Sequence, residues 1–421
     1  MPIHDLGYRG WPNKYASDLF RFWVIASSGI QVVGRNTWVK RMLLVAWLPT
    51  FVLAAILFGY ERLLDHREFA SAPTDIRETI LANISSQLQD GDVVLEALTT
   101  KNLEENRHLM WSWLLSAFLR VPQAVMTMLI VGLIAPPLIA RDVRTRAYLM
   151  YFSKPIGRVE YILGKMIVVG TYLMFITTVP ALGCYIFGVA LSSNLSMLAD
   201  TWDLPLRIVF ASLIFIIPAV SVALMFSSLT SESRFAAFAW FAFWGLGFIG
   251  WNLTYAVMMD EAYQTLSAQR DPEQSFDALE QWIDKAAKSG LINPTQISQL
   301  KEAVHPPVPP PPHVHLTEEV HREIEMRRHL YYEMRRQAEE LGFVDLEQKQ
   351  FEADLAAARK KIATHPMSLV SIYDTLVRLQ RWVFGLETQW SAIGPSLIVT
   401  ILVTLFAWCI LLRNVTALIR I

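Results

Sequence analysis

Six long apolar runs constrain this chain to a membrane-spanning fold. A transmembrane helix needs about 20 mostly apolar residues, and the runs have roughly that length or more: Met42–Tyr60, Leu114–Ala140, Ile162–Leu191, Leu206–Leu229, Phe235–Met258 and Ile393–Leu412. Charged residues make up 18% of the chain, against roughly a quarter in soluble domains. We therefore predict an all-α membrane protein with six transmembrane helices.

Prolines lie inside three of these runs. Pro136 and Pro137 are expected to deform the cytoplasmic end of the second helix, Pro180 the third and Pro218 the fourth. Spanning helices tolerate proline because neighbouring groups can satisfy the carbonyls that it leaves unbonded.

The basic residues of the short loops indicate the orientation, because Lys and Arg stay on the cytoplasmic side. They concentrate before the first run, between the second and third, and after the sixth, whereas loop 61–110 is acidic. These segments alternate correctly if both termini of this multi-pass protein are cytoplasmic. Loop 61–110 is then outside. The same count of spans places the large insert 259–390 outside, and a missed span would reverse it.

The runs divide the chain into four predicted parts. Residues 1–41 form a cytoplasmic or interfacial amphipathic helix, and 42–258 hold spans one to five. Residues 259–390 form an extracytoplasmic helical insert, and 391–421 hold the sixth span and a cytoplasmic tail.

The insert combines a stiff spacer with charged helices. Residues 305–313 are rich in proline and predict a polyproline II spacer. The stretch Thr317–Ala363 carries a narrow apolar stripe, which favours packing on a partner helix or a second copy; a substrate surface is the alternative. Pro366–Gly385 is amphipathic and is expected to lie flat on the outer membrane face.

The sequence lacks the common catalytic and phosphate-binding motifs. There is no GxxxxGK[ST] loop, so the chain is not expected to hydrolyse ATP itself, and there is no HExxH, GxSxG or CxxC. A membrane-embedded enzyme is therefore disfavoured. The centres of the runs contain no acidic residue, which argues against an ion-coupled carrier. The net charge of −1 gives no reason to expect a nucleic-acid partner.

Histidines gather in the insert, where they could bind a transition metal. Cys184 and Cys409 both lie in apolar runs, and no cysteine accompanies the histidines. Solvated or packing histidines are the favoured interpretation, and we predict no metal site and no cofactor in this chain. The histidines are His305, His313, His315, His321 and His329.

Two features could belong to a transport conduit. Arg120 lies near the outer end of the second run, where it would either extend to the interface or stand at a conduit mouth. The fifth run holds Trp240, Trp244 and Trp251 among small residues, a pattern typical of a packed helix interface. A lining for a lipid-like substrate is the alternative.

The loop between the second and third runs is unusually rich for a linker. Residues 141–161 combine basic residues, aromatic rings and a proline. Aromatic and Arg side chains are typical anchors of protein interfaces, and Tyr148, Tyr151 and Phe152 are candidates. A helix that lies on lipid alone is the other interpretation.

This loop resembles the cytoplasmic loop of type-2 ABC exporter permeases. The resemblance is carried by Leu138–Asp142, Ala147-Tyr148, Tyr151–Ile156, Glu160-Tyr161 and Gly164-Lys165. Near the N-terminus, Tyr8–Trp11 and Arg21–Ala26 are similar to one bacterial branch of these permeases. The resemblance covers roughly residues 1–258 and 366–421 but not the insert.

In that family the loop is a coupling helix that docks into a groove on a separate ATP-binding subunit. The resemblance therefore implies the permease subunit of an ATP-driven exporter in the bacterial cytoplasmic membrane, with ATP and Mg bound by the partner. It implies a set of ATPase-coupling residues: Arg141, Arg144, Tyr148, Tyr151, Phe152, Ser153, Lys154, Pro155 and Arg158.

Further expected partners are a second permease copy as a homodimer, membrane lipid, and an extracytoplasmic protein through 259–390. The alternative function is a non-transporting scaffold, whose outer insert binds envelope partners and is moved by the ATPase.

Overall fold

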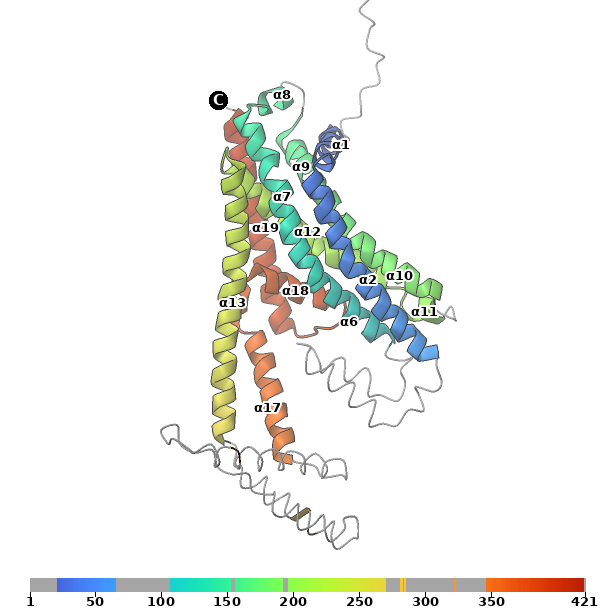
Figure 1. The fold of residues 1–421 in the computed structure, drawn as a ribbon. Coiled ribbons are helices and arrows are strands. Elements are labelled where there is room, and N and C mark those ends of the chain that lie inside the picture. The colour runs from blue at the N-terminus through green and yellow to red at the C-terminus, as the bar shows by residue number, and fades with distance from the viewer. Residues whose placement is uncertain are drawn as a thin grey trace, which may run out of the picture. The chain divides into compact units, whose positions relative to one another are not determined.

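Helices make up the regular secondary structure of the described residues, which contain no strand (Figure 1). The computed structural model describes residues 21–65, 107–152, 156–191, 196–269, 281, 282, 284, 322 and 346–419. The contacts divide the chain into two units, one of Met1–Trp251 with Met367–Ile421 and one of Asn252–Pro366. The all-α prediction is confirmed.

Six helices or helix pairs in the described residues are long and apolar enough to cross a membrane, as predicted. Two of the six are helix pairs. The bounds are α2 Thr37–Asp65, α6 Arg107–Arg120 with α7 Pro122–Arg144, α9 Arg158–Ile176 with α10 Thr178–Leu191, α12 Leu204–Ser228, α13 Ser233–Gln269 and α19 Trp390–Ile419.

Figure 1 shows α1, α8 and the end of α19 at one end of the first unit, which we call the α8 end. The opposite end holds α11, Ser196–Asp200, and we call it the α11 end.

Prolines account for the interruptions in two of the spans. Pro122 is the first residue of α7 and follows the break at Val121. Pro180 lies in the first turn of α10, just after the break at Thr177. Proline lacks an N–H donor and restricts the residue before it, yet fits the first turn of a helix. The break predicted near Pro180 is present, whereas the one at Val121 was not predicted.

A buried serine compensates for the proline pair inside α7. The Ser227 hydroxyl of α12 donates to the Pro136 carbonyl at 2.6 Å. It accepts from the backbone N–H groups of Ile139 and Ala140, both at 3.1 Å. In a regular helix these N–H groups would bond to carbonyls four residues earlier. Ser227 thus replaces a disturbed part of the α7 ladder and fixes α12 against it.

The N-terminal helix α1, Arg21–Gly34, packs along α9. Glycines permit the close approach: a Cβ on Gly164 would lie 2.8 Å from Ile25, and one on Gly29 would lie 2.5 Å from Val168. Outward-facing Trp23 is exposed, as suits an amphipathic helix. This agrees with a helix within residues 1–41, of which 1–20 lie outside the described residues.

Two apolar clusters form the core of the first unit. The larger gathers residues of α1, α2, α7, α9, α12, α13, α18 and α19, including Ile130, Ile162 and Leu173. The smaller lies around α6, α10 and the start of α12, and includes Trp111 and Phe384. The six spans therefore pack around a shared interior.

The segment before the last span is also part of this interior. A 3₁₀ turn, Pro366–Val370, leads into α18, Ile372–Val383, which contacts α12, α19 and α6. Its apolar Leu376 is buried, but so are Arg378 and Gln380. The helix itself was predicted, but a helix lying flat on a membrane face would leave its polar side in water. Here both sides are packed.

The second unit contains the end of α13 and α17, Leu346–Ala363. Within it, the rings of Tyr263 and Phe351 lie 5.7 Å apart, edge to face. The predicted polyproline spacer 305–313, the five histidines and residues 66–106 of loop 61–110 lie outside the described residues.

Candidate functional site

The loop between α7 and α9 forms a short helix at the α8 end. After α7, a turn with Arg146 in the left-handed region, at φ 54°, leads into α8, Tyr148–Phe152. The start of α9 is capped by Glu160, whose carboxylate accepts from the Gly157 N–H at 2.7 Å. Predicted coupling residues Ser153, Lys154 and Pro155 lie outside the described residues.

A buried ionic cluster lies beneath α8. Asp142, near the end of α7, accepts hydrogen bonds from the Lys165 ammonium at 2.7 Å and the Tyr161 hydroxyl at 2.8 Å. The Lys165 nitrogen also lies 5.4 Å from the ring centres of Tyr151 and Tyr161. We call Asp142, Tyr151, Tyr161 and Lys165 the Asp142 cluster. Since its members come from three helices, the cluster joins α7, α8 and α9.

The burial of this cluster makes its pairing necessary. Lys165 is 7% exposed, and an ion so far removed from water requires a partner. Asp142 supplies the opposite charge, and the two tyrosine faces supply cation–π attraction. Burial and the nearby Asp142 charge raise the pKa of Tyr151, so its hydroxyl stays protonated.

The aromatic rings predicted as partner anchors pack against their own chain. Tyr148 is 9% exposed, and Tyr151 and Phe152 stack near Tyr161 at 5.5 and 5.6 Å between ring centres. In this structure they position α8 on the spans. Their coupling role stays a prediction, and within the chain it acts through the placement of α8.

The outward face of α8 is formed by residues that sequence reasoning missed. Leu149 is 55% exposed and Met150 67% exposed. Helical spacing could have indicated them, because they lie between the inward-facing positions 148 and 151–152. Adjacent apolar residues on a solvent-facing turn are a candidate contact for a partner protein.

The predicted coupling arginines surround this face. Arg141, Arg144 and Arg158 are exposed. Arg158 donates to the Thr416 hydroxyl of α19 at 2.9 Å, and Arg144 lies 3.8 Å from the Glu232 carboxylate. The α8 end is thus basic around an apolar centre.

The candidate conduit tryptophans are buried within one copy of the chain. Trp240, Trp244 and Trp251 are 0%, 4% and 7% exposed. Trp240 donates its indole N–H to the Met128 carbonyl of α7 at 2.9 Å, and Trp244 lies 5.6 Å from Phe215 of α12. These contacts are those of a packed interface, and the conduit role stays a prediction.

Arg120 stands at the break between α6 and α7. Its backbone carbonyl accepts from the Tyr373 hydroxyl of α18 at 2.8 Å. Burial raises the pKa of Tyr373 to about 12, so the phenol remains a donor. α18 therefore closes the exposed backbone of this break, and a conduit role for the Arg120 side chain stays a prediction.

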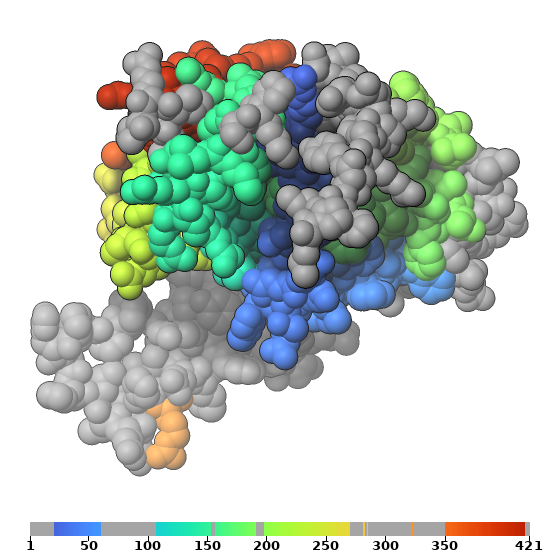
Figure 2. Space-filling view, turned by 90° about the horizontal axis from the view of Figure 1, so that it is seen from above, coloured from blue at the N-terminus to red at the C-terminus, as the bar shows by residue number. Residues whose placement is uncertain are grey.

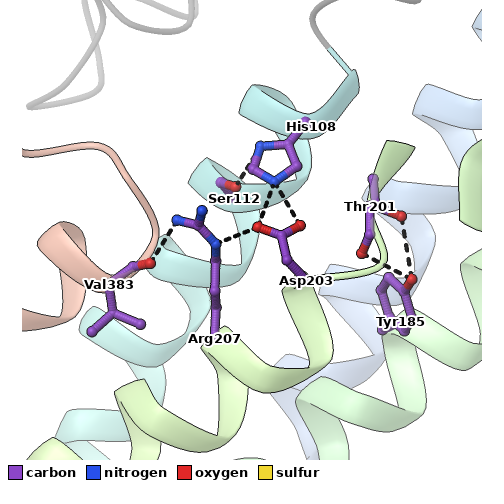
Figure 3. Close-up of polar contacts among 7 residues, drawn as sticks. All are labelled: His108, Ser112, Tyr185, Thr201, Asp203, Arg207 and Val383. Carbon is purple, nitrogen blue, oxygen red and sulfur yellow. Dashed lines mark hydrogen bonds and ion pairs between the residues drawn. The ribbon is translucent and has the colours of Figure 1, made fainter. Parts of the chain in front are cut away.

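A second polar cluster joins helices at the α11 end (Figure 3). Asp203 accepts from His108 of α6 at 2.9 Å and from the Arg207 Nε at 2.5 Å. Arg207 also donates to the Val383 carbonyl at the end of α18, at 2.7 Å. Burial alone would raise the Asp203 pKa, but the His108 and Arg207 contacts outweigh it and lower that pKa.

No described residues form a group of three or more His, Cys, Asp or Glu side chains placed to hold a metal ion. The Asp203 contacts instead serve as a structural link between α6, α12 and α18.

Comparison with known proteins agrees with the loop resemblance. The model of a family described as ABC-2 family transporter protein matches residues 32–319. Searches of curated proteins and of solved structures gave no match. The family match covers more than half of the chain and five of the six spans. The chain is therefore a multi-pass membrane protein that belongs to the ABC-2 transporter family.

Proposed function

We propose that this chain is the permease subunit of an ATP-driven exporter, with a separate ATP-binding subunit docking at the α8 end. Membership of the ABC-2 family implies an ATP-binding partner in general, and the sequence has no phosphate loop of its own. On this proposal the α8 end is cytoplasmic, in a bacterial cytoplasmic membrane, and the partner binds ATP and Mg.

The observation that carries this proposal is the Asp142 cluster. A docking helix can move the spans only if it is held rigidly to them. The cluster holds α8 to α7 through Asp142 and to α9 through Tyr161 and Lys165. Helix α9 in turn contacts α1, α7 and α12, so a displacement of α8 would reach most of the bundle.

The outward face of α8 has the chemistry that a docking surface needs. Leu149 and Met150 would be buried by the partner, and Arg144 and Arg158 would meet acidic groups at the rim. Closure of two ATP-binding subunits would then swing two such joints. This movement would open a path between two permease copies in a homodimer, or extrude a lipid or peptide sideways.

The test is a charge placed on the docking face. Met150→Glu should weaken co-purification with the ATP-binding subunit and its ATPase stimulation at least about tenfold, since a buried unpaired carboxylate costs more than ~1.4 kcal/mol. Leu198→Glu, at an exposed apolar position of α11, is the matched control. Unchanged binding and ATPase stimulation in Met150→Glu would refute docking at α8.

The scaffold alternative draws on the second unit. Asn252–Pro366 forms a compact unit of its own, as a separate partner-binding part would. Deleting Glu261–Thr364 distinguishes the two functions: transport survives if the first unit is an exporter, and all activity is lost if the insert is the working part.

A further inference from the structure

A small basic pocket lies at the α8 end, between the end of α7 and the start of α13. It is lined by Pro137, Arg141 and Arg144 of α7, and by Ser231 and Ser233 at the turn into α13. Its volume is about 130 Å³, whereas one water needs only roughly 10–15 Å³ of such space. The pocket can therefore hold a group of several atoms. Figure 2 views this end, with the surface of residues 107–152 (teal) beside that of α13 (yellow).

The lining is suited to an anion with several oxygens. Two guanidinium groups and two hydroxyls supply hydrogen-bond donors, and the Arg fork fits phosphate geometry. Arg141 makes no ion pair with the residues that the structure describes. Arg144 lies 3.8 Å from Glu232, a long contact that leaves most of its donors available.

The backbone adds to this attraction. α13 begins at Ser233 and runs for 37 residues, so its positive N-terminal end is directed at the pocket. The Glu232 carbonyl accepts from the N–H groups of Phe235 and Ala236, which fixes this first turn in place. The helix end therefore reinforces the two arginines.

The next turn of α13 places the pocket at the border of the apolar layer. Phe235 is 59% exposed and Phe238 73% exposed. The Arg234 guanidinium covers the Phe235 ring at 5.1 Å. Exposed rings beside basic groups are typical of the membrane interface, and basic pockets between spanning helices bind anionic head groups.

We propose that this pocket binds the phosphate of an anionic membrane phospholipid, held by Arg141, Arg144, Ser231 and Ser233. Free phosphate has the same chemistry but would not use the exposed rings. The proposal is independent of the exporter assignment, because lipid binding requires no ATP-binding subunit. Glu232 competes for Arg144, so its removal should tighten binding.

The experiment uses the purified full chain in detergent without any ATP-binding protein. Dioctanoyl phosphatidylglycerol is titrated and bound lipid is counted by native mass spectrometry, with dioctanoylglycerol as the lipid that lacks phosphate. Arg141→Gln and Arg144→Gln should each weaken binding about fivefold, from ~1 kcal/mol per basic residue. Glu232→Gln should strengthen it a few-fold. Arg413→Gln, at an exposed arginine of α19, is the matched control and should change nothing.

Three outcomes would overturn the proposal. One is equal affinity of wild type and the Arg141→Gln/Arg144→Gln double variant. Another is an equal loss in Arg413→Gln, which would indicate diffuse charge attraction. The third is inorganic phosphate displacing the lipid at concentrations near that of the lipid, which would assign the pocket to a soluble ion. The expected Glu232→Gln gain supports the proposal without requiring a variant that loses stability.

Discussion

Replacing Lys165 by Met tests whether the Asp142 cluster holds α8 to the spans. Lys165 is 7% exposed, and its ammonium lies 2.7 Å from the Asp142 carboxylate. The substitution keeps the length of the side chain but removes its charge. Asp142 then remains in a site where its side chain is only 15% exposed, with the Tyr161 hydroxyl as its donor.

The expected loss of stability follows from these contacts. Breaking a buried ion pair from one side costs about 3–5 kcal/mol, because the remaining charge stays buried without its partner. Asp142 retains some contact with water, which favours the lower part of that range. Each lost cation–π contact adds roughly 0.5–1 kcal/mol or more. We therefore expect Lys165→Met to lower the free energy of unfolding by about 3–4 kcal/mol.

The assay is unfolding of the purified chain in mixed detergent micelles, followed by tryptophan fluorescence. Lys40→Met, at an exposed lysine of α2, is the control and should stay within about 0.5 kcal/mol of wild type. The Asp142→Asn/Lys165→Met pair should lose less than the sum of its single variants, by at least ~1 kcal/mol. Additive losses, or a Lys165→Met chain as stable as wild type, would refute the reasoning.

Two further predictions concern links between helices. Asp203→Asn should destabilise the chain by about 1.5–3 kcal/mol at neutral pH. The folded-state pKa of Asp203 lies below its ordinary value of 3.8. Its contribution is therefore full above that value and is lost as pH falls through the folded-state pKa. Unfolding measured from pH 7 to pH 3 should show the difference shrink, and a constant difference would contradict this. Ser227→Ala should cost about 1–3 kcal/mol by freeing α7 backbone groups, whereas Ser27→Ala, at a more accessible serine of α1, should be nearly neutral in the same assay.

The spans were predictable because a bilayer makes a local demand. Each spanning helix must be apolar along about 20 residues whatever its neighbours are. The sequence also predicted the break near Pro180, since proline acts on its own backbone. Pro122 carries the same signal and was passed over, because the apolar run continues through it.

Amphipathic patterns were less informative. The apolar stripe of α18 indicates a helix with one buried side, but a membrane face and a protein groove produce the same stripe. Only the structure shows that Arg378 and Gln380 are buried as well. Likewise, a loop with aromatic rings can direct them to a partner or to its own chain, and Tyr148 and Tyr151 are directed inward.

The sequence by itself determined the six spans, the importance of loop 141–161 and the absence of a phosphate loop. These follow from composition and order along short stretches. Tertiary structure alone decided that Asp142 meets Tyr161 and Lys165, that Ser227 reaches the α7 backbone, and that Arg141 and Ser233 share a pocket. The physical reason is that apolar length is a local property, whereas these contacts depend on how helices distant in sequence pack together.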